Sequence, residues 1–119
     1  METRRLINAT CPECRGPLTE VATDGIVEYT CLIGHRYSPR GLLLAHSEAQ
    51  ERALWAATLA LQEAKVLADE VAPHLGGDAD SVRQQGDQKR QEAEAVRTVI
   101  DEWQQFQLPE SEGDPTREP

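Results

Sequence analysis

The chain has 119 residues and a net charge of −9, so it holds one small domain or two very small ones with a modest core. Aromatic residues make up 4% of the sequence, and packing must therefore depend on Leu, Val, Ile and Ala. We find no apolar run long enough to cross a bilayer and no apolar core of a signal peptide near the start. We therefore expect a cytoplasmic protein that spans no membrane.

The negative charge is unevenly distributed along the chain. Residues 1–40 carry five basic and five acidic side chains, whereas residues 41–119 carry seven basic and sixteen acidic ones. An acidic surface repels phosphate backbones at long range. This distribution disfavours nucleic acid as the main partner.

Four residues near the start have the spacing of a tetrahedral zinc site. Cys11 and Cys14 form a C-x-x-C pair, and Cys31 and His35 supply a second pair of ligands. A site with three cysteines and one histidine uses every cysteine of the chain, whereas disulfide pairing would leave one over. This favours a reducing compartment. We therefore predict one zinc ion bound by Cys11, Cys14, Cys31 and His35.

Residues 1–38 are predicted to form a zinc ribbon, in which a short β-hairpin brings two metal-binding turns together. The runs 18–22 and 26–31 flank Thr23-Asp24-Gly25, which is a hairpin signal. A core of this size recovers too little free energy to order the ribbon, so folding should need the metal.

Glycines and a short apolar pair complete the predicted ribbon. Leu6-Ile7 indicates a short edge strand that enters the first turn. Gly16 is expected to adopt a positive φ just after the first metal-binding turn, and Gly34 is expected to make the second turn.

The hydrophobic period changes to that of a helix at Ser38-Pro39, where Ser38 can cap the first free N–H groups. Residues 39–107 are predicted to form an antiparallel helical hairpin, with helices over about 39–73 and 79–107. Pro73 and Gly76-Gly77 should end the first helix. The expected fold is therefore a small α+β protein, a zinc ribbon followed by a long helical hairpin.

The second helix and the tail have weaker signals. Asp78, Asp80 and Ser81 are candidate N-caps for this helix. Its early turns contain Gln85, Gly86 and Lys89, so fraying is expected there. Residues 108–119 are predicted to be a disordered acidic tail because they offer almost nothing to bury.

The two remaining histidines have structural interpretations. His46 lies on the apolar face of the first helix near its start, and a position in the core or facing the ribbon is favoured over a metal-ligating one. His74 follows Pro73 at the end of this helix, where a cation interacts favourably with the helix dipole.

A second apolar stripe on the first helix is formed by Leu44, Trp55, Leu59 and Val66. A helix that packs against one partner helix does not need two apolar faces, and Trp is enriched at interfaces. Scattered exposed apolar residues are the alternative. The stripe predicts contact with a protein partner or a weak homodimer through the long helix, on a face away from the second helix.

Three sequence runs resemble a known accessory segment: C-P-E-C-R-G-P-L at 11–18, Y-T-C-L-I-G-H-R-Y-S at 29–38 and A-L-W-A-A-T-L-A-L-Q-E-A at 53–64. They are similar to the zinc-ribbon-plus-helix extension after the catalytic domain of some bacterial chemotaxis-type protein-glutamate methylesterases. The catalytic domain of that family is absent here. The resemblance implies an accessory role in bacterial signalling, with Cys11, Cys14, Cys31 and His35 matching the metal-binding residues of the extension.

The sequence therefore favours a non-enzymatic, zinc-stabilised interaction or regulatory module. The alternative is a nucleic-acid-binding regulator of transcription, which would use the ribbon arginines Arg4, Arg5, Arg15, Arg36 and Arg40. A zinc hydrolase is a minor third hypothesis, and it would require His35 to lie off the metal so that water can bind.

Overall fold

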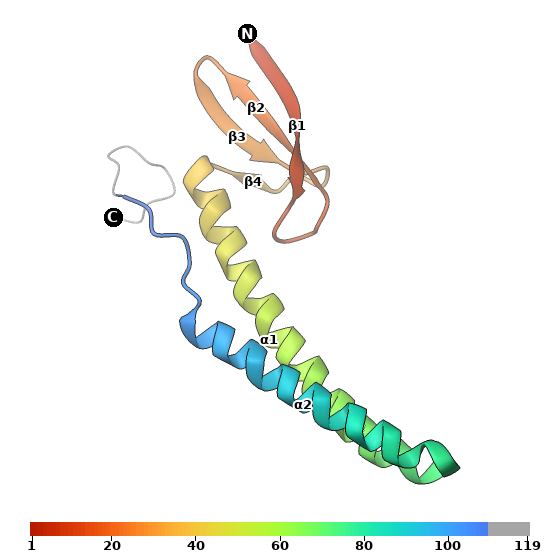
Figure 1. Ribbon diagram of the computed structural model, residues 1–119. Coiled ribbons are helices and arrows are strands. Elements are labelled where there is room, and N and C mark those ends of the chain that lie inside the picture. Colours follow the sequence, from red (N-terminus) through yellow and green to blue (C-terminus); the bar gives the residue numbers. More distant parts are fainter. Residues whose placement is uncertain (110–119) are drawn as a thin grey trace. The chain divides into compact units, whose positions relative to one another are not determined.

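The computed structural model describes residues 1–109 (Figure 1), and the predicted tail from residue 110 onward lies outside this range. The described range begins with four strands: β1 (Glu2–Thr10), β2 (Pro17–Thr23), β3 (Ile26–Thr30) and β4 (Arg36–Tyr37). Two helices follow: α1 (Pro39–Val71) and α2 (Ala79–Glu102). Two 3-10 turns, η1 (Ala72–His74) and η2 (Gly76–Asp78), join the helices. The predicted α+β fold, a small sheet followed by a helical hairpin, is confirmed.

The chain divides into two compact units. Of the described residues, the first contains Met1–Ala49 and 104–109, and the second is Gln50–Trp103. The boundary falls inside α1, whereas the sequence placed it at 38/39.

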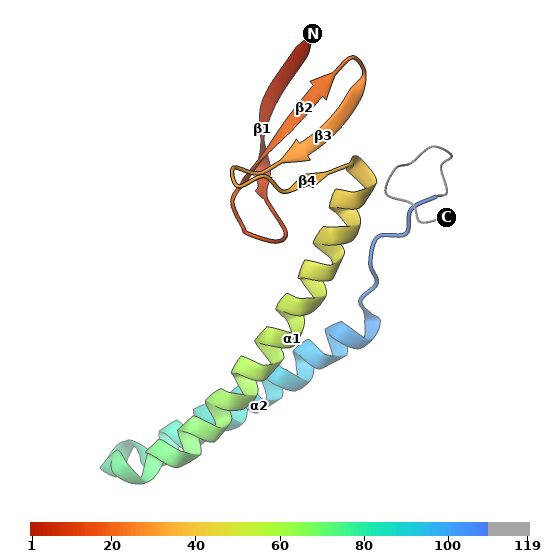
Figure 2. The same ribbon diagram turned by 180° about the vertical axis from the view of Figure 1, so that it is seen from behind.

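The first unit contains an antiparallel sheet with the strand order β1-β2-β3-β4, visible from both sides (Figures 1 and 2). The predicted hairpin joins β2 to β3, with Thr23 paired to Ile26 across a two-residue loop. In this loop Asp24 has φ 52° and Gly25 has φ 84°. Two consecutive positive φ values define the tight turn that matches the twist of paired strands, so Asp-Gly is the expected sequence.

Strand β1 is longer than the predicted Leu6-Ile7 edge strand, since it covers Glu2–Thr10. It pairs regularly with β2 from Glu2 to Leu6, and the register then shifts before Thr10 meets Pro17. Most of its side chains are exposed, so the strand lacks the apolar alternation that would mark its length in the sequence.

The core of the first unit surrounds the cysteines. Cys11, Leu18 and Cys31 are buried, and the partly buried hydrophobic residues packed against them are Ile7, Cys14, Tyr29, Tyr37 and Leu42. Leu42 belongs to the first turns of α1, so the ribbon and the start of this helix share one core.

Helix α1 begins as predicted at Pro39. The backbone N–H of Gly41 donates to Ser38 Oγ at 3.0 Å, which satisfies one of the free donors of the first turn. The helix ends at Val71, just before the predicted stop at Pro73, and Gly76 takes a positive φ of 58° in the connection.

Helices α1 and α2 lie side by side along the second unit in both views (Figures 1 and 2). The seam, meaning the line along which the two helices contact each other, is narrow and contains small residues. Gly86 is buried in α2, and a Cβ added there would lie 2.6 Å from the Cβ of Ala68 in α1. Helix α2 is continuous through Gln85, Gly86 and Lys89, where fraying is expected from the sequence, and Gly86 allows the two helices to approach closely.

Helix α2 ends at Glu102, not at 107. Trp103 has extended backbone angles, φ −68° and ψ 140°, and its indole N–H donates to Gln50 Oε1 at 3.1 Å. In the first unit, the N–H of Phe106 donates to the buried Ser47 Oγ at 3.1 Å. The contact with Ser47 satisfies the backbone N–H of Phe106, which a longer helix would have bonded within itself. Among residues 1–109, no helix combines the length and the apolar composition that crossing a membrane requires.

Candidate metal centre

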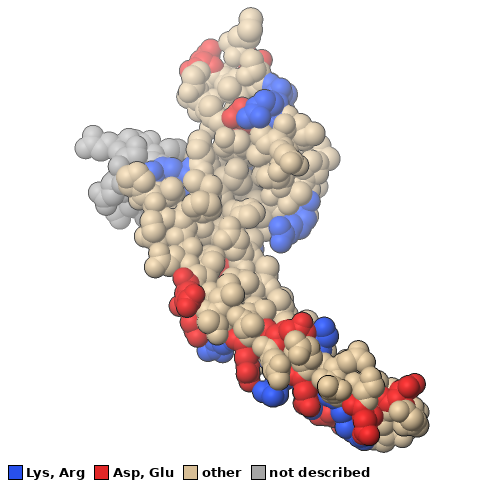
Figure 3. Space-filling view, viewed as in Figure 1, with Lys and Arg blue, Asp and Glu red and all other residues tan. Residues whose placement is uncertain are grey.

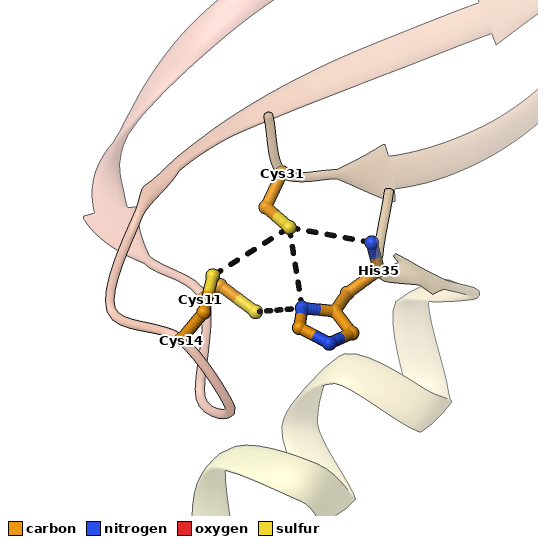
Figure 4. Close-up of side chains that lie close together, drawn as sticks. All are labelled: Cys11, Cys14, Cys31 and His35. Carbon is orange, nitrogen blue, oxygen red and sulfur yellow. Dashed lines mark hydrogen bonds between the residues drawn. The ribbon is translucent and has the colours of Figure 1, made fainter. Parts of the chain in front are cut away.

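The four predicted ligands lie together in the first unit (Figure 4). The ligand atoms of Cys11, Cys14, Cys31 and His35 lie within 4.8 Å of one another. His35 Nδ1 is 3.5 Å from Cys11 Sγ and 3.3 Å from Cys31 Sγ, and the sulfurs of Cys14 and Cys31 are 3.6 Å apart. A tetrahedral zinc site with ordinary bond lengths separates its ligand atoms by about 3.5–3.8 Å. The cluster therefore has the size and the donor set of a metal site.

The first metal-binding turn is closed by backbone hydrogen bonds. The N–H of Arg15 donates to the carbonyl of Cys11 at 2.8 Å, and the N–H of Cys11 donates to that of Gly16 at 2.7 Å. The residue with a positive φ is Arg15, at 63°, so the expectation for Gly16 is wrong. Gly16 has a different use here. Its N–H donates to Cys14 Sγ at 3.4 Å, and an added Cβ would lie 3.4 Å from that sulfur.

The second metal-binding turn has the predicted geometry. Gly34 adopts a positive φ of 103°, and its N–H donates to the carbonyl of Cys31 at 3.2 Å. The N–H of His35 donates to Cys31 Sγ at 3.3 Å. The turn therefore points one sulfur and one imidazole inward and directs a backbone donor at the sulfur.

Hydrogen bonds to the sulfurs favour thiolates in this cluster. Burial raises the pKa of Cys11, but donation from the Tyr37 hydroxyl and from the backbone N–H groups of Cys14 and Glu13 lowers it to about 6. Burial likewise opposes ionisation of Cys31, and the backbone N–H groups of His35 and Ile33 help to bring the pKa of this thiol below its usual value. Since a thiolate is the form that binds metal, the turns prepare two ligands.

The other two ligands respond to these negative sulfurs. The Gly16 N–H and burial oppose each other at Cys14, and the neighbouring sulfurs of Cys31 and Cys11 leave the pKa of this thiol raised. The hydrogen bond to Cys31 is the main cause of the raised pKa of His35, with burial opposing it and Cys11 and Glu13 adding to it. The cluster thus concentrates negative charge, and a bound cation would compensate for it.

The remaining predicted site residues lie outside this cluster. Leu44, in the first unit, is 36% exposed; in the second unit Trp55 is 42%, Leu59 57% and Val66 59% exposed. The guanidinium of Arg97 in α2 lies 4.8 Å from the centre of the Trp55 ring. Trp55 therefore borders the helix seam, so the expectation that it lies on a face away from α2 is wrong.

Most of the ribbon arginines already have carboxylate partners. Three of the five are ion-paired: Arg4 with Glu2, Arg5 with Glu20 and Arg36 with Glu28. In the second unit, acidic side chains gather along the helical hairpin with basic ones between them (Figure 3). Neither arrangement forms the uninterrupted basic surface typical of proteins that bind phosphate backbones.

His46 and His74 lie where their structural interpretations place them. His46 is half-buried and lines a groove with residues of β1, the first metal-binding turn and the start of β2, namely Leu6, Ile7, Asn8, Ala9, Thr10, Arg15 and Pro17. It therefore faces the ribbon. His74 is exposed in the last turn of η1.

Two residues around the cluster were missed in the sequence. Glu13 Oε2 lies 3.0 Å from His35 Nε2, and the Tyr37 hydroxyl lies 3.2 Å from Cys11 Sγ. A carboxylate between the two cysteines of C-x-x-C was a usable signal for Glu13. No comparable signal marks Tyr37, because its strand, β4, contains only two residues.

Comparison with known proteins adds no relatives. No protein-family model matches the chain, and neither a curated protein nor a solved structure matches it. The resemblance to methylesterase extensions therefore stays a prediction.

Proposed function

We propose that this protein is a non-enzymatic interaction module whose ribbon is stabilised by one zinc ion. The gathering of Cys11, Cys14, Cys31 and His35 within 4.8 Å carries this proposal. Three thiolates and one imidazole suit zinc better than harder cations, which prefer oxygen ligands. Four protein ligands complete a tetrahedral shell, an arrangement typical of structural zinc and not of a site that activates water.

The interaction surface that we propose is the Trp55 stripe, defined as Trp55, Leu59 and Val66 in the second unit. All three side chains are exposed on α1, and the guanidinium of Arg97 lies over the indole ring at 4.8 Å from its centre. An exposed Trp beside aliphatic residues is typical of an interface anchor. The occupant that we propose is a second copy of this chain, since the same stripe on two copies is self-complementary about a two-fold axis.

The energetics allow at most a weak dimer. Complete burial of such a side chain contributes roughly 1.5–3 kcal/mol, and these side chains are already partly buried. Association costs about 4–15 kcal/mol before any surplus appears. Each copy also brings a net charge of −9, so moderate salt should strengthen the contact by screening repulsion.

Two measurements test this proposal. Elemental analysis of the purified protein should give one zinc per chain, and a metal-free folded ribbon would contradict the metal assignment. Sedimentation equilibrium of the zinc-loaded chain should show weak association that grows with salt and is lost in Trp55→Asp. Ala53→Asp is the matched control, because this exposed position lies roughly 160° around the same helix at 100° per residue. A wild type that stays monomeric at high micromolar concentration at both salt levels would contradict the dimer.

The cellular setting that we propose is bacterial signalling, supported by the resemblance of 11–18, 29–38 and 53–64 to methylesterase extensions. Its cytoplasmic location is supported by three free thiols that one metal ion can use. Nucleic acid is disfavoured as the partner because three ribbon arginines are ion-paired. Binding to phosphate would weaken steeply between about 50 and 200 mM salt, the opposite of the trend expected for the dimer.

A further inference from the structure

The imidazole of His35 is held from both sides. Its Nδ1 faces the sulfurs of Cys11 and Cys31 (Figure 4). Its Nε2 lies 3.0 Å from Glu13 Oε2. A histidine can bind a metal through either nitrogen, and the hydrogen bond at the other nitrogen decides which. This geometry directs Nδ1 towards the metal position and leaves an N–H at Nε2 to donate to the carboxylate.

Glu13 is well placed to fix this arrangement because it lies inside the first metal-binding turn, between two of the ligands. Its backbone N–H contributes to the hydrogen bonding of Cys11 Sγ, so the residue that holds His35 is itself anchored to the cluster. Its carboxylate also interacts with the Tyr37 hydroxyl, which in turn contacts Cys11 Sγ. One carboxylate thus links the two metal-binding turns through His35 and Tyr37.

We propose that Glu13 is a positioning residue that holds His35 in the tautomer that binds zinc through Nδ1 and thereby strengthens metal binding. This inference rests on the proposed zinc site and goes beyond it, since it assigns a role in metal binding to a residue that is not a ligand. The side chain of Glu13 is 55% exposed and that of His35 is 32% exposed. Solvent therefore reaches the pair and screens the charge of Glu13. Its main contribution is to orient the His35 ring, more than to attract the metal ion through its negative charge.

The test is a competition titration of zinc between the full chain and a chromogenic chelator of known affinity. Loss of a carboxylate that orients a ligating histidine typically weakens metal binding about 10–100-fold, which we expect for Glu13→Ala. Glu13→Gln keeps an acceptor oxygen and should lose less. The matched control is Glu28→Gln, which removes a carboxylate in β3 that pairs with Arg36. Equal zinc affinities for Glu13→Ala and Glu28→Gln would overturn the proposal.

A second readout uses the wild type and does not depend on variants that fold. Long-range ¹H–¹⁵N spectra of the zinc-loaded chain should show His35 protonated at Nε2 and metal-bound at Nδ1. Zinc bound through Nε2 would overturn the proposal, because that nitrogen would have turned away from Glu13. A wild type that binds no zinc would instead contradict the proposed function, so the two failures are distinguishable.

Discussion

The ribbon and the helical hairpin bury different kinds of residue for different reasons. In the ribbon, two of the three residues at the centre of the core, Cys11 and Cys31, are candidate metal ligands, and Leu18 is the third. In the hairpin, the buried residues are small: Thr58, Ala72, Gly86 and Ala93. Helices satisfy their own backbone hydrogen bonds, so a narrow seam is enough, whereas we expect the ribbon, with its small apolar core, to need the proposed metal ion.

The largest expected difference between the ribbon and the hairpin follows the removal of one candidate metal ligand. Zinc contributes on the order of 10–16 kcal/mol to the folding of such sites, so Cys31→Ser should unfold the ribbon and leave the hairpin helical. Amide resonances of the strands should collapse into the random-coil region while most of the helical circular dichroism remains. Leu32→Ser is the control, because Leu32 is 86% exposed beside Cys31 and its loss should leave the ribbon folded.

A substitution in the seam should affect the hairpin alone. In Gly86→Ala the new Cβ would lie 2.6 Å from the Cβ of Ala68, so the helices must shift. Overpacking costs about 1–3 kcal/mol, and the better helix propensity of Ala returns up to about 1 kcal/mol. Urea denaturation should show a net loss of up to about 2 kcal/mol with the zinc affinity unchanged. The exposed Gln84→Ala should be neutral, and a stabilised Gly86→Ala would mean that the seam is looser than described.

The contact between Arg97 and Trp55 should contribute less. Cation–π pairs at exposed sites contribute about 0.5–1 kcal/mol, which is the expected loss in Arg97→Gln. Arg90→Gln removes a neighbouring charge that pairs with Glu94 and serves as the control. If both variants unfold at the same urea concentration, the ring is not held by Arg97.

The smallest effect concerns the ion pair between the helices, in which Lys65 Nζ lies 2.9 Å from Asp87 Oδ1. The hydrogen bond to Lys65 lowers the pKa of Asp87. The stability from this carboxylate is therefore present at neutral pH and is lost as pH falls through the lowered pKa. Asp87→Asn should melt slightly below the wild type at pH 7, and the two should converge in acid. A difference that grows in acid would contradict the pairing.

The ligand spacing and the Asp24-Gly25 turn could be predicted because both depend on local chemistry. The same is true of the Ser38 cap, where one side chain and one turn of backbone are enough. The length of β1, the close approach at Gly86 and the end of α2 at Glu102 could not be predicted. Each depends on what a distant segment supplies: backbone pairing with β2, the small side chain of Ala68 and the acceptor of Gln50.

The most direct test of the account is a chelator titration of the wild-type chain followed by residue-resolved ¹H–¹⁵N spectra. We expect residues 1–49 to lose their dispersed resonances as zinc is removed, since the start of α1 shares the ribbon core through Leu42. Resonances of 50–103 should remain folded. Simultaneous loss of both sets would show that the two units fold as one, and a ribbon unchanged by complete zinc removal would contradict its dependence on the metal.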